Sequence, residues 1–241
     1  MIKRLFIFAV LILMGTVFLK LGVNYSENGA LLKLGHYYVD KGPAEIGAAN
    51  LVTSVVVTYR GLDTLGEVTV LFISAAGVGQ MLRRTRKKAG EDDEEDDDST
   101  MRRHKPSSEI VETATELLLP MVILFGIYVF LNGHLSPGGG FQGGAIIASG
   151  TMFLLLALPE SHISRAMISF TESLSGFGYV IVGVLGVVLG GGFLDNRIMG
   201  LGEYGSLFSA GAIPLIYTFV GLKVGFELSA VLDRFREDSE S

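Results

Sequence analysis

Residues Leu117 to Pro159 read LLLPMVILFGIYVFLNGHLSPGGGFQGGAIIASGTMFLLLALP, and this stretch decides the fold class. Two long apolar runs flank one segment rich in glycine and proline, and the only titratable side chains are Tyr128 and His134. Long uncharged apolar runs are typical of transmembrane helices, because a helix needs about 20 residues to cross a hydrocarbon core of about 30 Å. The stretch therefore predicts two membrane-spanning helices joined by a tight turn.

The composition of the whole chain agrees with lipid as its solvent. Hydrophobic residues make up 49% of the chain and charged residues 18%, whereas soluble domains carry about 25% charged residues. The 32 glycines suit helices that pack closely in a bilayer. The absence of cysteine excludes disulfides, thiolate metal sites and iron–sulfur clusters on this chain, and we expect no cofactor and no nucleic-acid partner.

Six segments are long enough to cross the membrane: Leu5–Val23, Leu65–Leu82, Ile110–Leu131, Phe141–Leu158, Ile168–Gly190 and Leu207–Val231. The first is read as a retained anchor, because no small-x-small cleavage site follows it at the distance that a signal peptide requires. A further apolar segment, Ala44–Val57, would reach only about 21 Å as a helix. We expect it to form a short helix, buried among the spans or lying at the outer face.

The basic residues set the expected orientation, since cytoplasmic loops carry an excess of Lys and Arg. Lys3 and Arg4 precede the first span, and five basic residues between Arg83 and Lys88 follow the second. The loops that begin at His134 and Asp195 are then external, and both termini are cytoplasmic. In the loops after the second span, Arg197 is the one basic residue on the wrong side of this pattern.

A charged segment divides the chain. Residues 89–108 include eight successive acids from Glu91 to Asp98, and such a like-charge block repels itself and stays disordered. A solvated tether is favoured over a docking segment for a basic partner. The prediction is an all-α integral membrane protein with about six transmembrane helices in a two-plus-four arrangement, with a two-span module at 1–88 and a four-span module at 109–241.

The most specific local sequence is GHLSPGGGFQGG, residues Gly133–Gly144. Pro137 and the glycines that follow it allow the chain to reverse tightly, and Gly140 and Gly144 form a small-xxx-small pair at the start of the next span. Backbone N–H groups at a helix start can also hold an anion. A structural turn packed against a partner is favoured over ion binding, and His134 is expected to be a hydrogen-bonded structural residue.

Two further constellations carry charge at membrane depth. In TYRGLDTLGE, residues 58–67, Arg60 and Asp63 can pair, while Glu67 either faces an interior or water-filled path or caps the helix start; both interpretations stay open. Lys223 and Glu227 share one helix face. Three interpretations stay open: the two residues form a structural pair, they belong to a polar path, or the Lys223 side chain snorkels to the cytoplasmic surface. Glu172 is expected near a cytoplasmic helix entrance, in a solvated or capping role.

Two stretches resemble known families. NLVTSVVVTYRGLDTLGEVTVL, Asn50–Leu71, resembles the C-terminal end of the large A-type subunit of Mrp-type sodium/proton antiporters, and the small membrane subunit of energy-converting membrane-bound hydrogenases. Gly133–Gly144 resembles the signature of the MnhB subunit of Mrp antiporters, and with the four-span pattern this resemblance covers roughly Ser107 to Asp233. The presence of both motifs on one chain suggests a fusion of two subunits that are adjacent in the complex.

The resemblance implies a non-catalytic subunit of a multisubunit Mrp-type cation/proton antiporter in a prokaryotic plasma membrane, with other membrane subunits as partners and Na⁺ or H⁺ as transported ions. It agrees with the absence of any catalytic, metal-ligand or nucleotide motif. The ion-path candidates are Glu67, Thr64, Thr69, Lys223 and Glu227. The motif or assembly residues are Arg60, Asp63, His134, Pro137, Gly139 and Phe141. The alternatives are the same module in a redox-driven hydrogenase or sulfur-reducing complex, and a purely structural subunit.

Overall fold

The computed structural model describes residues 2–23, 32–92, 108–158 and 164–240, and every regular element in these ranges is a helix. The chain divides into two compact units, Met1–Tyr37 and Tyr38–Ser241. The first contains α1 (Ile2–Val23) and the start of α2 (Lys33–Ile46). The predicted first span, Leu5–Val23, lies wholly within α1, and its crossing of the membrane stays a prediction.

The second unit is a helical bundle. After α2 it contains α3 (Leu51–Thr53), the π-helix η1 (Ser54–Tyr59), α4 (Gly61–Asp92), α5 (Glu109–Leu131), α6 (Gly140–Ala157), α7 (Arg165–Leu189), the short 3₁₀ helix η2 (Asn196–Ile198) and α8 (Ile213–Glu240). Two of the longer helices start at recognisable caps, since the Ser108 and Ser164 side chains accept hydrogen bonds from the backbone N–H groups of Val111 and Met167.

Five helices of the described residues are long and apolar enough to span a membrane. Their spanning parts are Gly61–Leu82, Glu109–Leu131, Gly140–Ala157, Arg165–Leu189 and Ile213–Arg236. They confirm the all-α prediction and coincide closely with four of the predicted spans. The fifth begins later than expected, at Ile213 instead of Leu207, because Ala210 and Gly211 have φ angles of 61° and 57°, which a right-handed helix cannot contain.

The prediction of one short helix at Ala44–Val57 was wrong. α2 ends at Ile46, Gly47 has a φ of 76°, and a new helical segment begins after Asn50. Thr53, Ser54 and Val57 are buried while Val52 is exposed, and the position of this segment relative to the membrane stays a prediction. A glycine with positive φ breaks the helix at little steric cost, so an apolar run that reads as continuous forms two elements.

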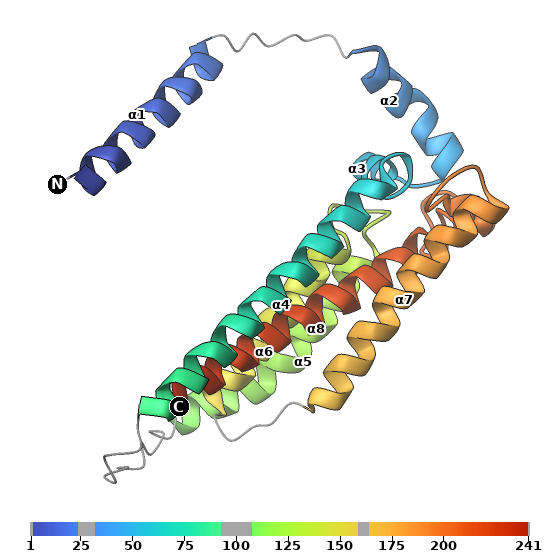
Figure 1. The fold of residues 1–241 in the computed structure, drawn as a ribbon. Coiled ribbons are helices and arrows are strands. Elements are labelled where there is room, and N and C mark those ends of the chain that lie inside the picture. Colours follow the sequence, from blue (N-terminus) through green and yellow to red (C-terminus); the bar gives the residue numbers. More distant parts are fainter. Residues whose placement is uncertain (1, 24–31, 93–107, 159–163, 241) are drawn as a thin grey trace. The chain divides into compact units, whose positions relative to one another are not determined.

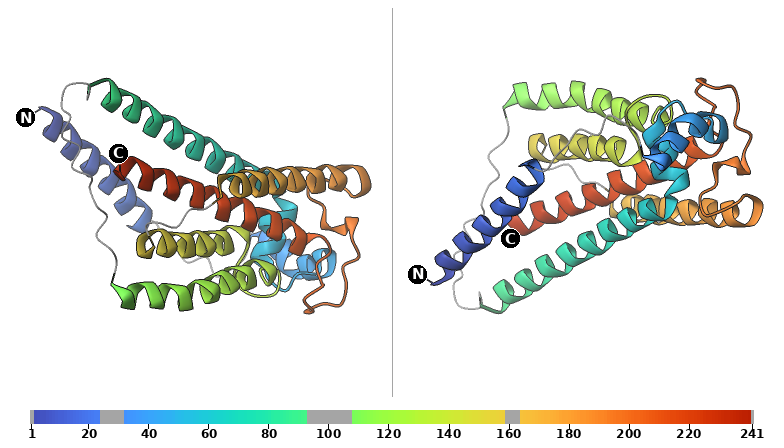
Figure 2. Two further views of the ribbon diagram at one scale, coloured as in Figure 1. Left: turned by 90° about the horizontal axis from the view of Figure 1, so that it is seen from below. Right: turned by 90° about the horizontal axis from the view of Figure 1, so that it is seen from above.

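α8 occupies the middle of the bundle. It packs against α6 and α5 on one side, and against α4 and α7 on the other side, as the two views of Figure 2 show. α4, which precedes the predicted linker, and α8, which follows it, belong to one compact unit (Figure 1). The division into a two-span and a four-span module stays a prediction. α4 continues to Asp92, inside the predicted linker, and residues 93–107 lie outside the described part of the chain.

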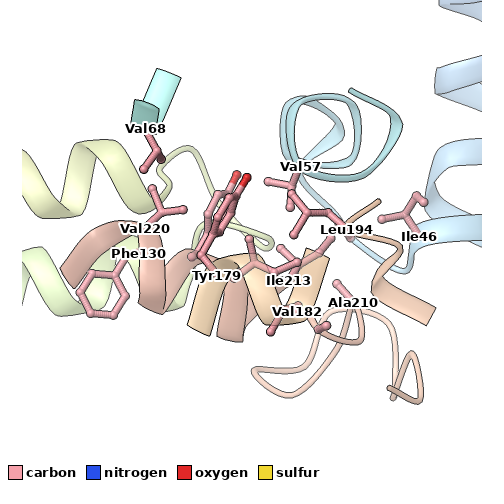
Figure 3. Close-up of a cluster of buried hydrophobic side chains, with 14 of the residues drawn as sticks. Ile46, Val57, Val68, Phe130, Tyr179, Val182, Leu194, Ala210, Ile213 and Val220 are labelled. Atoms are coloured by element: carbon pink, nitrogen blue, oxygen red, sulfur yellow. The ribbon is translucent and has the colours of Figure 1, made fainter. Parts of the chain in front are cut away.

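The hydrophobic core lies towards one end of this bundle. Its buried side chains come from the segments between helices as well as from the helices, and Figure 3 shows Val57 and Leu194 beside Ile213. Much of the remaining apolar surface is exposed, including Leu117 and Phe125 on α5. Exposed apolar helix faces are what a lipid bilayer or neighbouring transmembrane helices would cover.

The contact between α6 and α8 depends on glycine. A Cβ atom at Gly144 would lie 2.7 Å from the carbonyl oxygen of Gly221 and 2.8 Å from Cβ of Val224. A Cβ at Gly140 would lie 2.6 Å from Cβ of Val220. The small-xxx-small pair predicted from the sequence therefore packs against a helix of the same chain.

Replacing Gly144 with valine is expected to force α6 away from α8 and to lower the free energy of unfolding by about 2 kcal/mol or more. Thermal unfolding of the purified, detergent-solubilised complex measures this effect. The matched control is Gly77→Ala on α4, where an added Cβ meets nothing within 4 Å. Equal melting temperatures for both variants would contradict the close contact.

Candidate functional site

Three segments distant in sequence meet at the same end of the bundle: 46–60, 132–139 and 190–212. We call this region the loop end. Asn50 connects two of them, because its Nδ2 donates to the carbonyl oxygens of Gly133 and Ser136, each at 2.9 Å. Its Oδ1 accepts from the N–H groups of Val52 and Thr53, at 3.1 and 3.4 Å. One side chain thus caps α3 and holds the 132–139 turn.

Thr53 extends this connection to α8. Its hydroxyl donates to the carbonyl oxygen of Gly133 at 2.6 Å, and the Tyr217 hydroxyl lies 2.9 Å away. Since the Thr53 hydrogen is already directed to a carbonyl, Tyr217 is the donor of the second bond. All of these atoms lie away from solvent, where an unpaired polar group would cost about 1–3 kcal/mol.

The motif residues of the 132–141 region have structural positions. His134 is fully buried and its Nε2 lies 3.3 Å from the carbonyl oxygen of Ser206. Gly139 has a φ of 154°, in the range that favours glycine. Phe141 packs against the core, while Pro137 is exposed at the tip of the turn. The hydrogen-bonded position of His134 is the one expected from the sequence.

The segment from 190 to 212 completes the loop end. Asn196 is buried, and its Nδ2 donates to the carbonyl oxygens of Ile46 and Ala210 at 2.7 and 2.9 Å. Arg197 donates to both carboxylate oxygens of Asp195, with Nη2 2.5 Å from Oδ2. These bonds hold the pKa of Asp195 well below its ordinary value.

Arg60 and Asp63 form the predicted ion pair, and both side chains are largely exposed at the junction of η1 and α4. Such an exposed pair contributes little to stability. η1 itself is a π-helix, an uncommon element that occurs often at functional sites. Thr64 donates to the carbonyl oxygen of Val56 at 2.8 Å and so joins η1 to the first turn of α4.

Glu67 lies within the spanning part of α4, on its exposed face. It follows Gly61 by six residues, about 9 Å along the helix axis, so it is beyond the first turn, where Asp63 is the acidic residue. The helix-capping interpretation is therefore wrong. Glu67 is exposed while Thr64 and Val68 are buried, and its charge acts on the buried Tyr179 of α7.

The two threonines proposed with Glu67 do not gather around it. Thr64 is buried, while Thr69 is exposed and donates to the carbonyl oxygen of Leu65 at 2.8 Å on its own helix. At 100° per residue, Thr69 and Glu67 point to nearly opposite sides of α4. The role of all three residues in an ion path stays a prediction.

Three charged side chains, two of them buried and one partly exposed, come together inside the bundle. Lys223 Nζ donates to Glu172 Oε1 at 2.7 Å and lies 3.1 Å from Glu227 Oε2. Lys223 and Glu227 have exposed fractions of 7% and 2%. We call Lys223, Glu227 and Glu172 the Lys223 cluster.

The Lys223 cluster corrects two expectations. Lys223 does not snorkel, because α8 runs on for thirteen residues to Arg236, about 20 Å further along the axis, and its ammonium group is paired inside the protein. Glu172 has no capping role, since it lies seven residues after the start of α7 and bonds Lys223. The predicted pair of Lys223 and Glu227 is present.

α4 covers the Lys223 cluster from one side. The Lys223 ammonium group lies 4.8 Å from the ring centroid of Phe72, a cation–π distance. Further along α8, Arg234 Nη1 donates to the carbonyl oxygen of Ala75 at 3.4 Å. Within the described residues, no group of three or more His, Cys, Asp or Glu side chains could hold a metal ion.

Sequence reasoning missed Asn50, Asn196 and Tyr217 as connecting residues. Asn50 starts the stretch that resembles the large antiporter subunit, and its place before an apolar run is typical of a helix N-cap, so it could have been found. Asn196 and Tyr217 have no such local signal. Their partners lie 150 and 164 residues away in the sequence.

These features define a multi-pass helical membrane protein with a buried charge cluster and a tightly bonded loop end. A domain described as related to the MnhB subunit of Na⁺/H⁺ antiporter matches residues 110–230, just over half of the chain. The chain therefore belongs to this MnhB-related family. A second model, described as the MbhE subunit of MBH, matches residues 2–94. The two matches confirm both resemblances drawn from the sequence.

This chain is similar to subunits of two kinds of membrane complex, namely antiporters and a respiratory complex. The B-type subunit of the Na⁺/H⁺ antiporter of Bacillus subtilis is 37% identical over 95 residues, which are 38% of this chain and 66% of that protein. A chain of the membrane-bound sulfane sulfur reductase, an archaeal respiratory membrane complex, is 38% identical, covers 98% of both chains and has a TM-score of 0.78. A chain of the Mrp complex from Dietzia sp. DQ12-45-1b is 25% identical with a TM-score of 0.76, and the match covers 99% of this chain and 26% of that one.

His134 predicts a pH dependence of stability. Burial lowers its pKa from the ordinary value of 6.5, so the unfolded chain binds a proton more readily than the folded chain. Stability is then complete above about pH 7 and falls as the pH drops below 6.5, by at most about 1.4 kcal/mol per pH unit for one group. Melting temperatures of the purified complex between about pH 7.5 and about pH 5 measure the slope.

The variant His134→Gln is expected to have a lower melting temperature at every pH and a shallower pH dependence than the wild type. His36→Gln, which replaces an exposed histidine of α2, is the control and keeps the wild-type slope. If His134→Gln retains the full slope, the acid sensitivity comes from other groups.

Proposed function

We propose that this subunit contributes to the assembly of an Mrp-type cation/proton antiporter module, and that the exposed face of α4 around Glu67 lines the Na⁺ or H⁺ path together with a partner subunit. The single observation that carries the proposal is the position of Glu67, exposed on the bundle surface and about 9 Å inside the span of α4. The role as part of an ion path goes beyond the family assignment.

The argument is one of solvation. An ionised carboxylate that faces lipid costs at least a few kcal/mol, and nearby exposed residues of α4, such as Val70 and Ile73, are apolar. Among the described residues Glu67 has no ion pair or hydrogen bond, and its charge acts on the buried side chain of Tyr179 on α7. A water-filled path or a polar side chain of a partner would remove the cost. Glu67 would then lie at the boundary between two subunits.

The loop end supports the assembly role. Asn50, Thr53 and Asn196 donate to backbone carbonyl oxygens of distant segments inside the chain, so the loop end offers a rigid surface to a partner without refolding. The positive-inside pattern places this end outside the cytoplasm. Both termini would then be cytoplasmic, in a prokaryotic plasma membrane. The ions would be cargo, with no cofactor and no catalytic chemistry on this chain.

A second candidate is the same module in a redox-driven complex. It is favoured by the likeness to a chain of the sulfane sulfur reductase, which covers 98% of both chains. Affinity purification of the tagged native complex, followed by mass spectrometry, separates the two. Antiporter subunits alone support a secondary transporter, and co-purifying iron–sulfur or hydrogenase-like subunits support the redox-driven complex.

Replacement of Glu67 by glutamine is expected to lower cation-coupled proton transport in membrane vesicles at least tenfold, because the amide cannot carry the charge that a cation path needs. Glu67→Asp should retain part of the activity. The control is Glu203→Gln, which removes an exposed carboxylate from the loop end. Wild-type transport by a normally assembled Glu67→Gln complex would leave the purely structural role as the better account.

A further inference from the structure

The Lys223 cluster contains more negative than positive charge. It has two carboxylates, Glu172 and Glu227, and one ammonium group. Lys223 lies ten residues after Ile213, about 15 Å along α8, and thus near the middle of the span. At this depth an uncompensated charge is expensive.

The two carboxylates are not equivalent. Glu172 accepts a hydrogen bond from Lys223 at 2.7 Å, and its side chain is 23% exposed. Glu227 is 2% exposed, and neither of its carboxylate oxygens has a hydrogen-bond partner among the described residues. Its Oε2 lies within ion-pair distance of Lys223, at 3.1 Å, but outside hydrogen-bond geometry. Glu227 is therefore the surplus carboxylate.

The other charged groups do not neutralise Glu227 directly. Besides Lys223 and Glu172, Arg234 acts on it electrostatically, and Arg234 is exposed and bonded to the carbonyl oxygen of Ala75. α6 carries no titratable side chain, and α4 contributes the ring of Phe72. A further positive charge is thus required beside Glu227.

We propose that this charge is a proton, and that Glu227 is a proton-binding group of the membrane span. A sodium ion would need several oxygen ligands and would lie against the Lys223 ammonium group, which repels it. A proton needs one carboxylate oxygen. Its uptake forms one O–H bond on Glu227, takes the proton from hydronium and leaves water, and makes the cluster neutral.

The geometry also provides a means of release. Lys223 Nζ lies between the two carboxylates, at 2.7 Å from Glu172 and 3.1 Å from Glu227. A small movement of the lysine towards Glu227 stabilises the ionised form of that carboxylate and lets the proton leave. Glu172, with a side chain that is 23% exposed, is the most exposed member of the cluster. This inference deepens the proposed function, on which it rests, by adding a proton site to the transport module.

Infrared difference spectroscopy of the purified complex, recorded between two pH values, tests the proposal without measuring transport. We expect the C=O stretching band of a protonated carboxylic acid in the wild type and in Glu203→Gln. The band should be absent in Glu227→Gln and shifted in Glu227→Asp. A spectrum of Glu227→Gln that keeps the wild-type band would overturn the proposal.

Assembly gives a second readout. Glutamine has the shape of a protonated glutamate and no charge, so Glu227→Gln is expected to assemble and melt like the wild type. Failure of this variant to assemble would count against a proton on Glu227. The two proposals can fail independently. If the wild type shows no band from Glu227, the expected transport defect of Glu67→Gln is unaffected. If Glu67→Gln transports normally, the band of Glu227 is still expected.

Discussion

The close contact between α6 and α8 is the constraint on which the rest of the bundle depends. Gly140 and Gly144 leave room for Val220, Gly221 and Val224, so the two backbones approach each other directly. That approach places α8 between α6 on one side and α4 and α7 on the other. From this central helix Tyr217 reaches the loop end, and Lys223 reaches the carboxylates.

Polar groups in this protein are used in two distinct ways. At the loop end, amides and hydroxyls satisfy backbone groups of distant segments, and Asn50 and Asn196 act as connectors. In the bundle, charged side chains lie on helices that are long and apolar enough to span a membrane. Lys223 is paired within the chain, whereas Glu67 is exposed on the surface of α4. The two positions suggest separate tasks, one at a subunit boundary and one inside the helix bundle.

Helix positions followed well from sequence because hydrophobicity and charge are local properties. The glycine-rich turn before Phe141 and the pair of Lys223 and Glu227 were also found, since each depends on residues that are close in the chain. Where the prediction failed, the observed structure depends on a backbone conformation or on a partner residue that is distant in the sequence. The positive φ angles of Gly47, Ala210 and Gly211 moved helix ends that an apolar run alone does not reveal.

The sequence by itself determined that the chain is a helical membrane protein of the MnhB-related family, because long uncharged runs and short glycine-rich motifs carry that information locally. Only the tertiary structure decided that Glu67 is exposed, that Lys223 is buried, and that Glu172 belongs to the same cluster. Glu172 and Lys223 are 51 residues apart in the sequence. The pattern of apolar residues along one helix does not show which other helix its polar side chains face. Packing between helices sets that relation, because it fixes the rotation of each helix about its own axis.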